Sequence, residues 1–307
     1  MRGAFIDALV EVAEDDDSVA LLTGDLGFSV LEPFAERFPS RFFNAGVAER
    51  NMVGLATGMA SNGMRPYAYS IATFASMCAY EFLRNGAVLH DLPVRLVGIG
   101  GGVDYGHNGP THYAMEDIAL MRPQPGLAVV APADPEQARS ATLATAGLPG
   151  PAYLRIGKSE TPVPGLDGRF ELGRASMIGA GRDIAIVTSG SIAIEAVKAA
   201  ELLADEGVET TVAVTASISP PPLDDLASLL DTVDLTISLE SHYRDGGLGS
   251  LLCELVAERG IACRVLRLGF DSMPGPPGSA QFLYERHGLN AAGVAQAATA
   301  ALDLSPG

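Results

Sequence analysis

The sequence NAGVAERNMVGLATGMASNG, residues 44–63, carries the strongest fold signal in the chain. Its apolar residues have helical spacing from residue 48 onward, and Asn62-Gly63 is a typical helix stop. Glu49 stands in the first turn of this predicted helix, where the helix dipole favours a carboxylate. Because the residues before and after Glu49 are mostly small or apolar, we also expect this carboxylate to be buried. Burial is costly unless the group is paired or protonated.

Strand and helix patterns alternate in both directions from this stretch. Helical spacing covers the opening segment, 48–63, 74–91 and 134–147, and β-rich runs occur at 19–24, 41–46, 65–72, 94–100, 127–132 and 151–156. Apolar strands that alternate with helices predict a parallel sheet covered on both faces.

A second series of the same kind follows residues 158–174, a stretch whose prolines and glycines break the pattern. It has β-rich runs at 183–191, 208–214, 234–241 and 263–269, helical runs at 192–207 and 249–260, and two helical segments at the C-terminus. We therefore predict an α/β protein with two three-layer α/β/α domains, each with a mostly parallel sheet. The boundary is expected near residue 165, which gives domains 1–165 and 166–307.

Composition narrows the class of protein. The 307 residues carry a net charge of −17, which argues against a broad basic face for nucleic acid. The three cysteines, Cys78, Cys253 and Cys263, give neither a disulfide framework nor a metal-binding spacing, so no metal ligands are predicted in this chain. The absence of a long apolar stretch predicts no membrane contact, and we expect a cytoplasmic protein.

Four segments together resemble the transketolase family. Residues 46–63 are similar to the family's cofactor-binding helix, usually written GIAEQNM, and ATFASMCAYEFLRN (72–85) is similar to its TF-x-x-F-x-x-Y helix. GHNGPTHYAMEDIALMRPQPGLAVVAPAD (106–134) resembles the family's G-x-D-G-P-T-H signature, and SLESHYRDGGLGSLLCELV (238–256) its E-x-H…GGLG segment. The resemblance spans nearly the whole chain and implies a pyrimidine-binding domain followed by the family's C-terminal domain.

The resemblance implies thiamine diphosphate as cofactor, with the chemistry carried by the cofactor and its positioning by the protein. Glu49 would hydrogen-bond N1′ of the aminopyrimidine and so promote activation of the thiazolium C2. Asp25 matches a family aspartate near the cofactor, and Phe74 and Tyr80 would line the pyrimidine slot. Met77 stands where the family has the aromatic residue that stacks on the pyrimidine; a thioether can also pack on such a ring. Phe74 and Tyr80 are equally compatible with plain core aromatics.

The implied substrate residues are His112, Asn108, Arg2, Ser29 and Arg155. His112 matches the histidine that contacts sugar oxygens and shuttles protons, although an isolated histidine is often structural. Arg2, Ser29 and Arg155 fall where the family binds a sugar phosphate. Asn108 replaces an aspartate that reads the donor's C2 hydroxyl, and Gly100 replaces a histidine. His107, beside Asn108, is an extra polar group of unassigned use, and these departures affect the substrate side of the site.

Full-length members of the family hold the diphosphate and its metal through a GDG…N motif in a preceding domain. Gly24-Asp25 and Asn51 imitate that spacing, but Leu26 stands where the second glycine is needed. We therefore expect a partner chain, the N-terminal diphosphate-binding subunit, to hold Mg²⁺ and the diphosphate in an α2β2 heterotetramer.

The predicted activity is transfer of a two-carbon ketol or acyl-anion unit from a ketose or 2-oxo acid to an aldehyde or carrier. The alternatives are a subunit similar to the beta chain of a 2-oxo-acid dehydrogenase, one similar to deoxyxylulose-phosphate synthase, or a non-catalytic partner subunit.

Overall fold

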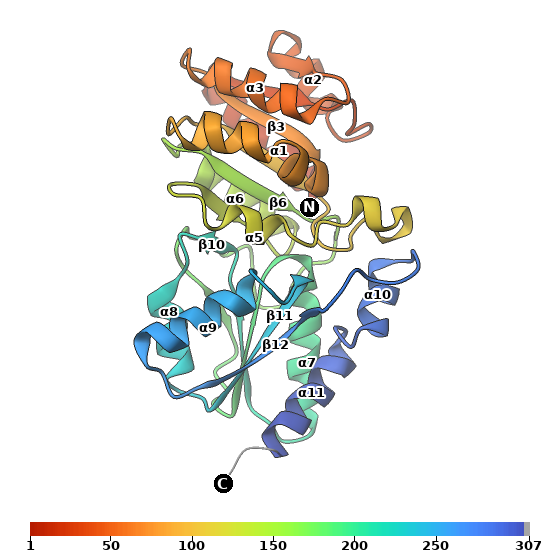
Figure 1. The fold of residues 1–307 in the computed structure, drawn as a ribbon, viewed down its shortest axis with the longest axis vertical. Coiled ribbons are helices and arrows are strands. Elements are labelled where there is room, and N and C mark those ends of the chain that lie inside the picture. Colours follow the sequence, from red (N-terminus) through yellow and green to blue (C-terminus); the bar gives the residue numbers. More distant parts are fainter. Residues whose placement is uncertain (304–307) are drawn as a thin grey trace.

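The computed structural model describes residues 1–303, which form two β-sheets with flanking helices (Figure 1). The first sheet, in the upper half of Figure 1, has the strand order β10-β5-β6-β4-β3-β1-β2. All of its neighbours are parallel except β10, which runs antiparallel to β5. Its strands are β1 (Val19–Thr23), β2 (Phe42–Asn44), β3 (Arg65–Ile71), β4 (Arg95–Ile99), β5 (Ala128–Val130), β6 (Ala152–Ile156) and β10 (Ser217–Ser219).

The second sheet has the order β12-β11-β8-β9-β7, and only β7 is antiparallel to its neighbour. Its strands are β7 (Ser176–Ile178), β8 (Ile184–Thr188), β9 (Thr210–Val214), β11 (Leu235–Tyr243) and β12 (Arg264–Phe270). The sequence predicted the four parallel strands but neither β7 nor β10. Both are three-residue strands, too short for an alternating pattern to be visible in the sequence.

The helices cover both faces of both sheets. In the first half they are α1 (Arg2–Asp15), α2 (Glu32–Arg37), α3 (Glu49–Ala60), α4 (Tyr80–Phe82), α5 (Asp117–Met121) and α6 (Pro135–Ala146). In the second half they are α7 (Ala193–Asp205), α8 (Leu223–Leu230), α9 (Leu248–Arg259), α10 (Ala280–Arg286) and α11 (Ala291–Asp303). Short 3₁₀ turns occur at η1 (Pro39–Arg41), η4 (Gly106–Asn108), η5 (Pro110–His112) and η6 (Gly190–Ile192).

Side chains alternate across each strand and so divide between two helix layers. In the first sheet, Tyr67 and Val97 share a core with α1 and α6, whereas Ala68 and Leu96 share one with α3. In the second sheet, residues of β8 and β9 pack with α7 and α11 on one face and with α8 and α9 on the other, and β11 adds to the first of these cores. The prediction of two three-layer α/β/α units is confirmed.

One predicted helix has an unexpected form. Residues 74–91 are not a continuous α-helix but two π-helical segments, η2 (Phe74–Cys78) and η3 (Leu83–Val88), on either side of the single turn α4. π-helical turns are rare and often mark functional sites. Apolar periodicity alone does not distinguish them from an α-helix.

Residues 157–175 join the two sheets as turns and irregular backbone, and within them we place the proposed boundary at residue 165. The two halves are closely interlocked there. β10 belongs to the second half of the chain but completes the first sheet, with Ser217 opposite Val130. One hydrophobic cluster contains Val129 of β5 and Val187 of β8, so the core continues from one sheet to the other.

Candidate functional site

Most of the predicted site residues follow the carboxyl ends of parallel strands in the first sheet. Asp25 follows β1, Glu49 follows β2, Phe74 follows β3 and His112 lies in the long connection after β4. The carboxyl ends of parallel strands lie at one edge of a sheet, and open α/β sheets bind their ligands there. The fold therefore places these residues along one edge.

Glu49 is the best-defined member of this group. It is the first residue of α3, its N-cap Ala48 provides no side-chain cap, and Glu49 is only 8% exposed. Its Oε1 accepts a hydrogen bond from Ser70 Oγ at 2.9 Å. Ser70 lies near the carboxyl end of β3 and is fully buried. The expectation of a buried carboxylate is confirmed, and its pairing with Ser70 is a feature that the sequence did not identify.

Gly24 forms the other side of the Glu49 site. A Cβ on Gly24 would lie 3.2 Å from Glu49 Oε1 and 3.7 Å from its carboxyl carbon. A side chain at this position would therefore press on the carboxylate, and glycine leaves the space open.

The connection after β1 carries Asp25 and Ser29, and both have a left-handed backbone, with φ of 59° and 63°. The exposed Asp25 Oδ1 accepts a hydrogen bond from Asn44 Nδ2 at 2.8 Å. The Ser29 amide donates to Glu32 Oε1 at 2.8 Å, and this contact lowers the pKa of the Glu32 carboxyl. Asp25 thus lies next to Gly24 in the chain and close to the Glu49 carboxylate, while Ser29 is exposed farther along the same loop.

The π-helical segment η2 brings the predicted pyrimidine and substrate residues together. The Phe74 ring meets the His112 ring edge-on, with centroids 5.3 Å apart. Met77 is 44% exposed on the same segment. Tyr80 begins α4, and its hydroxyl is bonded to the Gln124 side chain. Phe74 and Met77 are thus available to a ligand, whereas the Tyr80 hydroxyl is already paired within the chain.

The His112 loop is anchored by the second half of the chain. The Gly278 amide donates to the Gly106 carbonyl at 3.1 Å, and the buried Tyr113 hydroxyl donates to the same carbonyl at 3.2 Å. His112 Nδ1 lies 3.0 Å from Thr111 Oγ1, while the adjacent His107 and Asn108 are exposed. These contacts hold His112 at the edge of the site and leave residues 107 and 108 facing outward.

The run Gly100-Gly101-Gly102 has a steric explanation. Gly100 and Gly102 have positive φ values of 75° and 59°. A Cβ at Gly100 would collide with the Tyr105 ring, and one at Gly101 would collide with the Arg155 guanidinium. Where the family has a histidine, this chain therefore has a glycine, and the Tyr105 ring occupies the space of the missing side chain. The centroid of that ring is 6.2 Å from the centroid of the His112 ring.

Arg155 is buried, and most of its guanidinium is paired inside the chain. It is 5% exposed, and its guanidinium donates to both carboxylate oxygens of Asp117, at 2.7 and 3.1 Å. Nη2 also donates to the carbonyls of Ala114 and Ser241. These partners hold the pKa of Arg155 above its usual value despite burial. These contacts favour a structural role for Arg155 at the junction of the two halves over the phosphate role expected from the sequence.

Lys158 is a candidate that the sequence comparison overlooked. It follows the carboxyl end of β6, and its ammonium lies 4.1 Å from the centroid of the Tyr105 ring. Burial lowers the pKa of Lys158; the carboxylate of Asp104 opposes this effect, and the positive charge of Arg2 adds to it. Arg2 Nε is buried and has no hydrogen-bond partner among residues 1–303. The positive charges of Lys158 and Arg2 thus both act on the region around Tyr105.

The side chains of the E-x-H motif, Glu240 and His242, bond to the backbone of neighbouring elements rather than lying at the edge with the predicted site residues. Glu240 is buried and accepts hydrogen bonds from the amides of Leu248 and Gly249 at the start of α9, at 2.8 and 2.9 Å. Burial raises the pKa of Glu240 to about 7. His242 Nδ1 donates to the Tyr243 carbonyl, and Nε2 accepts from the Ala119 amide, which links β11 to α5.

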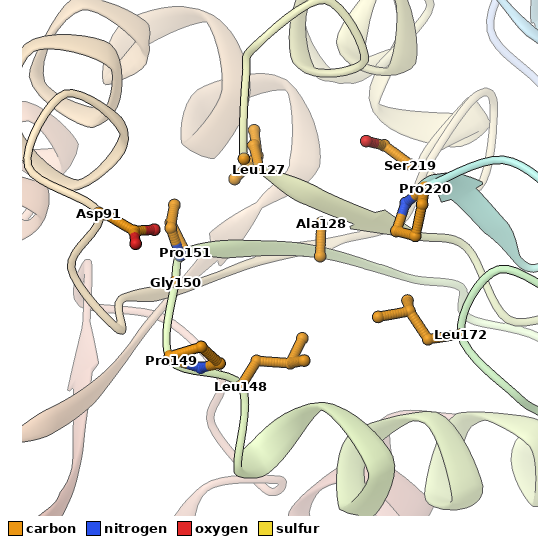
Figure 2. Close-up of a pocket in the computed structure, with 11 residues that line it drawn as sticks. Asp91, Leu127, Ala128, Leu148, Pro149, Gly150, Pro151, Leu172, Ser219 and Pro220 are labelled. Carbon is orange, nitrogen blue, oxygen red and sulfur yellow. The ribbon is translucent and has the colours of Figure 1, made fainter.

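A separate hollow lies at the amino ends of β5 and β6, away from these residues (Figure 2). Its walls are mostly apolar, with Leu148 and Leu172 facing the space and Asp91 at its margin. None of the predicted site residues lines it.

Among residues 1–303, no helix is long and apolar enough to cross a membrane, and no group of three or more His, Cys, Asp or Glu side chains could hold a metal ion.

Comparison with known proteins identifies the two halves. Residues 1–164 match the model of the transketolase pyrimidine-binding domain, and residues 173–294 match that of the transketolase C-terminal domain. A solved structure described as a split-gene transketolase, inactive beta4 tetramer, superimposes with a TM-score of 0.91 at 35% identity and covers 99% of each chain.

Several curated relatives have similar sequences. A putative transketolase C-terminal section from Methanocaldococcus jannaschii is 33% identical over 96% of this chain and 94% of its own length. A 6-deoxy-6-sulfo-D-fructose transketolase subunit from a Clostridium species is 33% identical over 97% and 93%. The 1-deoxy-D-xylulose-5-phosphate synthase of Syntrophotalea carbinolica is 32% identical over 95% of this chain but only 46% of its own length. With family models matching both halves of its structure, the chain belongs to the transketolase family.

Proposed function

We propose that this chain is the beta-type subunit of a two-chain, thiamine-diphosphate-dependent transketolase-like enzyme. Its reaction is transfer of a ketol or acyl-anion unit from a ketose or 2-oxo acid to an aldehyde or carrier. The observation that carries the proposal is the Glu49 carboxylate, buried in the first turn of α3 and paired with Ser70 at the carboxyl edge of the first sheet.

The residues present fit the pyrimidine half of the cofactor. Glu49 Oε2 has no hydrogen-bond partner among residues 1–303 and is not among their buried unpaired atoms, so it is accessible to a ring nitrogen. Gly24 leaves space beside the carboxylate, and Phe74 and Met77 offer apolar surface for a flat heterocycle. When bound, thiamine diphosphate supplies a nucleophilic carbon that bonds to the carbonyl carbon of the donor.

The chain's own residues would position the cofactor and bind the donor. Glu49 would hold N1′ through Oε2, with one proton between the carboxylate and the ring nitrogen, and so keep the ring in register. Asp25 is proposed to lie near the cofactor, with Asn44 fixing the orientation of its carboxylate. His112, packed against Phe74, is placed to bind a donor oxygen and move a proton to or from it. Asn108 is proposed to contact the donor with an amide in place of a carboxylate.

The far end of the substrate is proposed to be anionic. Arg2 and Lys158 supply two positive charges near Tyr105 for such an anion, with the Lys158 ammonium over the ring. Ser29 lies on an exposed loop and could add a hydroxyl. A sulfonate or a phosphate satisfies the same donors, and the sulfo-fructose transketolase subunit is an example of a relative named for an anionic sugar.

An exposed apolar face marks where a partner would cover the site. Among the described residues, seven of the ten large apolar side chains that are at least two-fifths exposed lie on or beside the elements that carry the pyrimidine residues, namely Phe28, Phe43, Val47, Leu55, Met77, Phe82 and Leu89. Such a patch is typical of a subunit interface. We propose that the diphosphate-binding subunit and its Mg²⁺ dock on this side and that the assembly is an α2β2 heterotetramer. The similar split-gene beta4 tetramer, described as inactive, is consistent with a site that one chain leaves incomplete.

The experiment that tests this proposal is a calorimetric titration with thiamine diphosphate and Mg²⁺. The native complex, purified by a tag on this chain, should bind the cofactor, whereas this chain alone should bind it weakly or not at all. Failure of the complex to bind would overturn the proposal and favour a non-catalytic subunit.

The deoxyxylulose-phosphate synthase relative supports a second candidate, in which the donor is a 2-oxo acid. Carbon dioxide release decides between the two donors, because a 2-oxo acid loses its carboxylate on transfer and a ketose does not. A requirement for a lipoyl acceptor would instead indicate an activity of the 2-oxo-acid dehydrogenase kind.

A further inference from the structure

Ser70 and Gly24 enclose one oxygen of the Glu49 carboxylate. Ser70 is fully buried, and its hydroxyl donates to Oε1 at 2.9 Å. On the other side, a Cβ at Gly24 would come within 3.2 Å of the same oxygen. Both residues belong to the carboxyl ends of neighbouring strands, because β1 and β3 pair directly, with Thr23 opposite Tyr69.

This enclosure distinguishes the two carboxylate oxygens. Oε1 is held by the hydroxyl and fills the space that Gly24 leaves open. Oε2 has no partner among the residues the structure describes and is not buried, so it is the oxygen presented to the site. A glutamate side chain has several rotatable bonds, and a single fixed oxygen removes much of the freedom at its end.

We infer that Ser70 is a positioning residue, which holds Glu49 Oε1 so that Oε2 faces N1′ of the bound aminopyrimidine. This inference rests on the proposed function and deepens it. Ser70 does not touch the cofactor or the substrate; it acts through Glu49. Gly24 acts with it by leaving open the space that Oε1 needs to accept this hydrogen bond, because a Cβ there would lie 3.2 Å from Oε1.

A purely structural role for Ser70 makes a different prediction. If its hydroxyl only satisfied a buried oxygen, its removal would destabilise the fold and weaken every ligand of the site equally. If it aims Oε2 at N1′, its removal weakens only ligands that carry N1′. The two roles are separated by comparing thiamine diphosphate with its analogue in which N1′ is replaced by C–H.

The test measures the affinity of the native complex for both ligands, with Mg²⁺ present, for four forms of this chain. Ser70→Ala should weaken binding of thiamine diphosphate by about fivefold, the weight of one ordinary hydrogen bond, and leave binding of the analogue unchanged. Ser70→Thr keeps a hydroxyl and should restore most of the difference. The matched control is Ser76→Ala, which removes another fully buried hydroxyl, one that donates to the Thr73 carbonyl rather than to Glu49. It should leave the ratio of the two affinities as in the wild type.

Gly24→Ala provides an independent variant that keeps the Ser70 hydroxyl. Its methyl group should displace the carboxylate by a few tenths of an ångström and also reduce the preference for thiamine diphosphate over the analogue. The inference is overturned if Ser70→Ala weakens both ligands equally, or neither, while the wild-type complex still prefers thiamine diphosphate. If the wild-type complex binds neither ligand, the proposed function itself has failed.

Discussion

The ring of Tyr105 occupies the space into which a side chain at Gly100 would project. The backbone gives a second reason for glycine at this position, because Gly100 has a φ of 75°, which disfavours a residue with a side chain. Restoring the histidine that the family carries at this point is therefore not a neutral change in this chain.

Gly100→His should destabilise the protein by about 2–4 kcal/mol, from backbone strain together with displacement of Tyr105. Urea unfolding of the purified chain measures this loss. The double variant Gly100→His with Tyr105→Ala should recover part of it, since the collision is removed while the backbone strain remains. Equal stability of the two variants would show that the ring is not the obstacle.

Lys158→Met should raise the KM for a donor with an anionic end by roughly tenfold or more, because one charge-assisted contact is lost. Steady-state kinetics of the complex with a phosphorylated and a neutral donor measure this effect, and the neutral donor should respond little. Lys198→Met is the control, since its ammonium is half-exposed and faces Glu195 at 3.5 Å. A uniform loss for both donors in Lys158→Met would contradict the anion site.

Arg155 and Asp117 form a buried ion pair, and removing one partner leaves the other charge unpaired. Arg155→Met should therefore lower the free energy of unfolding by about 3–5 kcal/mol. Arg155→Lys should not restore it, because a lysine lacks the two-pronged contact with the carboxylate. If Arg155→Met instead folds as stably as the wild type and loses only substrate affinity, the structural role assigned to Arg155 is wrong.

Glu240 gives the stability a defined dependence on pH. Burial raises the pKa of its carboxyl to about 7 from an ordinary 4.5, so its contribution is fully present below about pH 4.5 and is lost as pH rises through about 7. The loss is on the order of 3 kcal/mol. Burial lowers the pKa of the neighbouring His242, which contributes in the opposite direction. Urea unfolding should show about 2 kcal/mol of this loss between pH 5.5 and pH 8 in the wild type relative to Glu240→Gln, where the Glu240 contribution is absent, because the remainder is already lost by pH 5.5. Parallel pH profiles would contradict it.

The exposed apolar face can be tested with two leucines of similar exposure. Leu55 on α3 is 47% exposed within that face, and Leu202 on α7 is 41% exposed in the second half of the chain. Leu55→Glu should abolish assembly with the partner subunit, because a charge would be buried in an apolar interface. Leu202→Glu should leave it intact. Sedimentation velocity measures the outcome, and full assembly of the Leu55 variant would place the interface elsewhere.

Some of this structure could be predicted from the sequence because the physical signal is local. β-rich runs of five or more residues predicted β1, β3, β4 and β6, and the helical spacing with the Asn62-Gly63 stop predicted α3. Burial of Glu49 also followed from its apolar surroundings. These features depend on residues within one or two turns or strands of each other.

The remainder depends on contacts between distant segments. Ser70 is 21 residues from Glu49, and nothing in its own surroundings indicates that it meets a carboxylate. Arg155 resembles a substrate arginine until Asp117 is placed beside it, and Lys158 becomes a candidate only once Tyr105 lies under its ammonium. Strand β10 forms by pairing with β5, which belongs to the other half of the chain.

The most direct test of the central claim is the turnover of the reconstituted complex carrying Glu49→Ala. The substitution should leave assembly with the partner unchanged and reduce the rate of donor consumption by roughly a hundred- to ten-thousandfold, the usual contribution of a group that activates a reacting centre. A complex that assembles normally and keeps wild-type turnover without the Glu49 carboxylate would contradict the account.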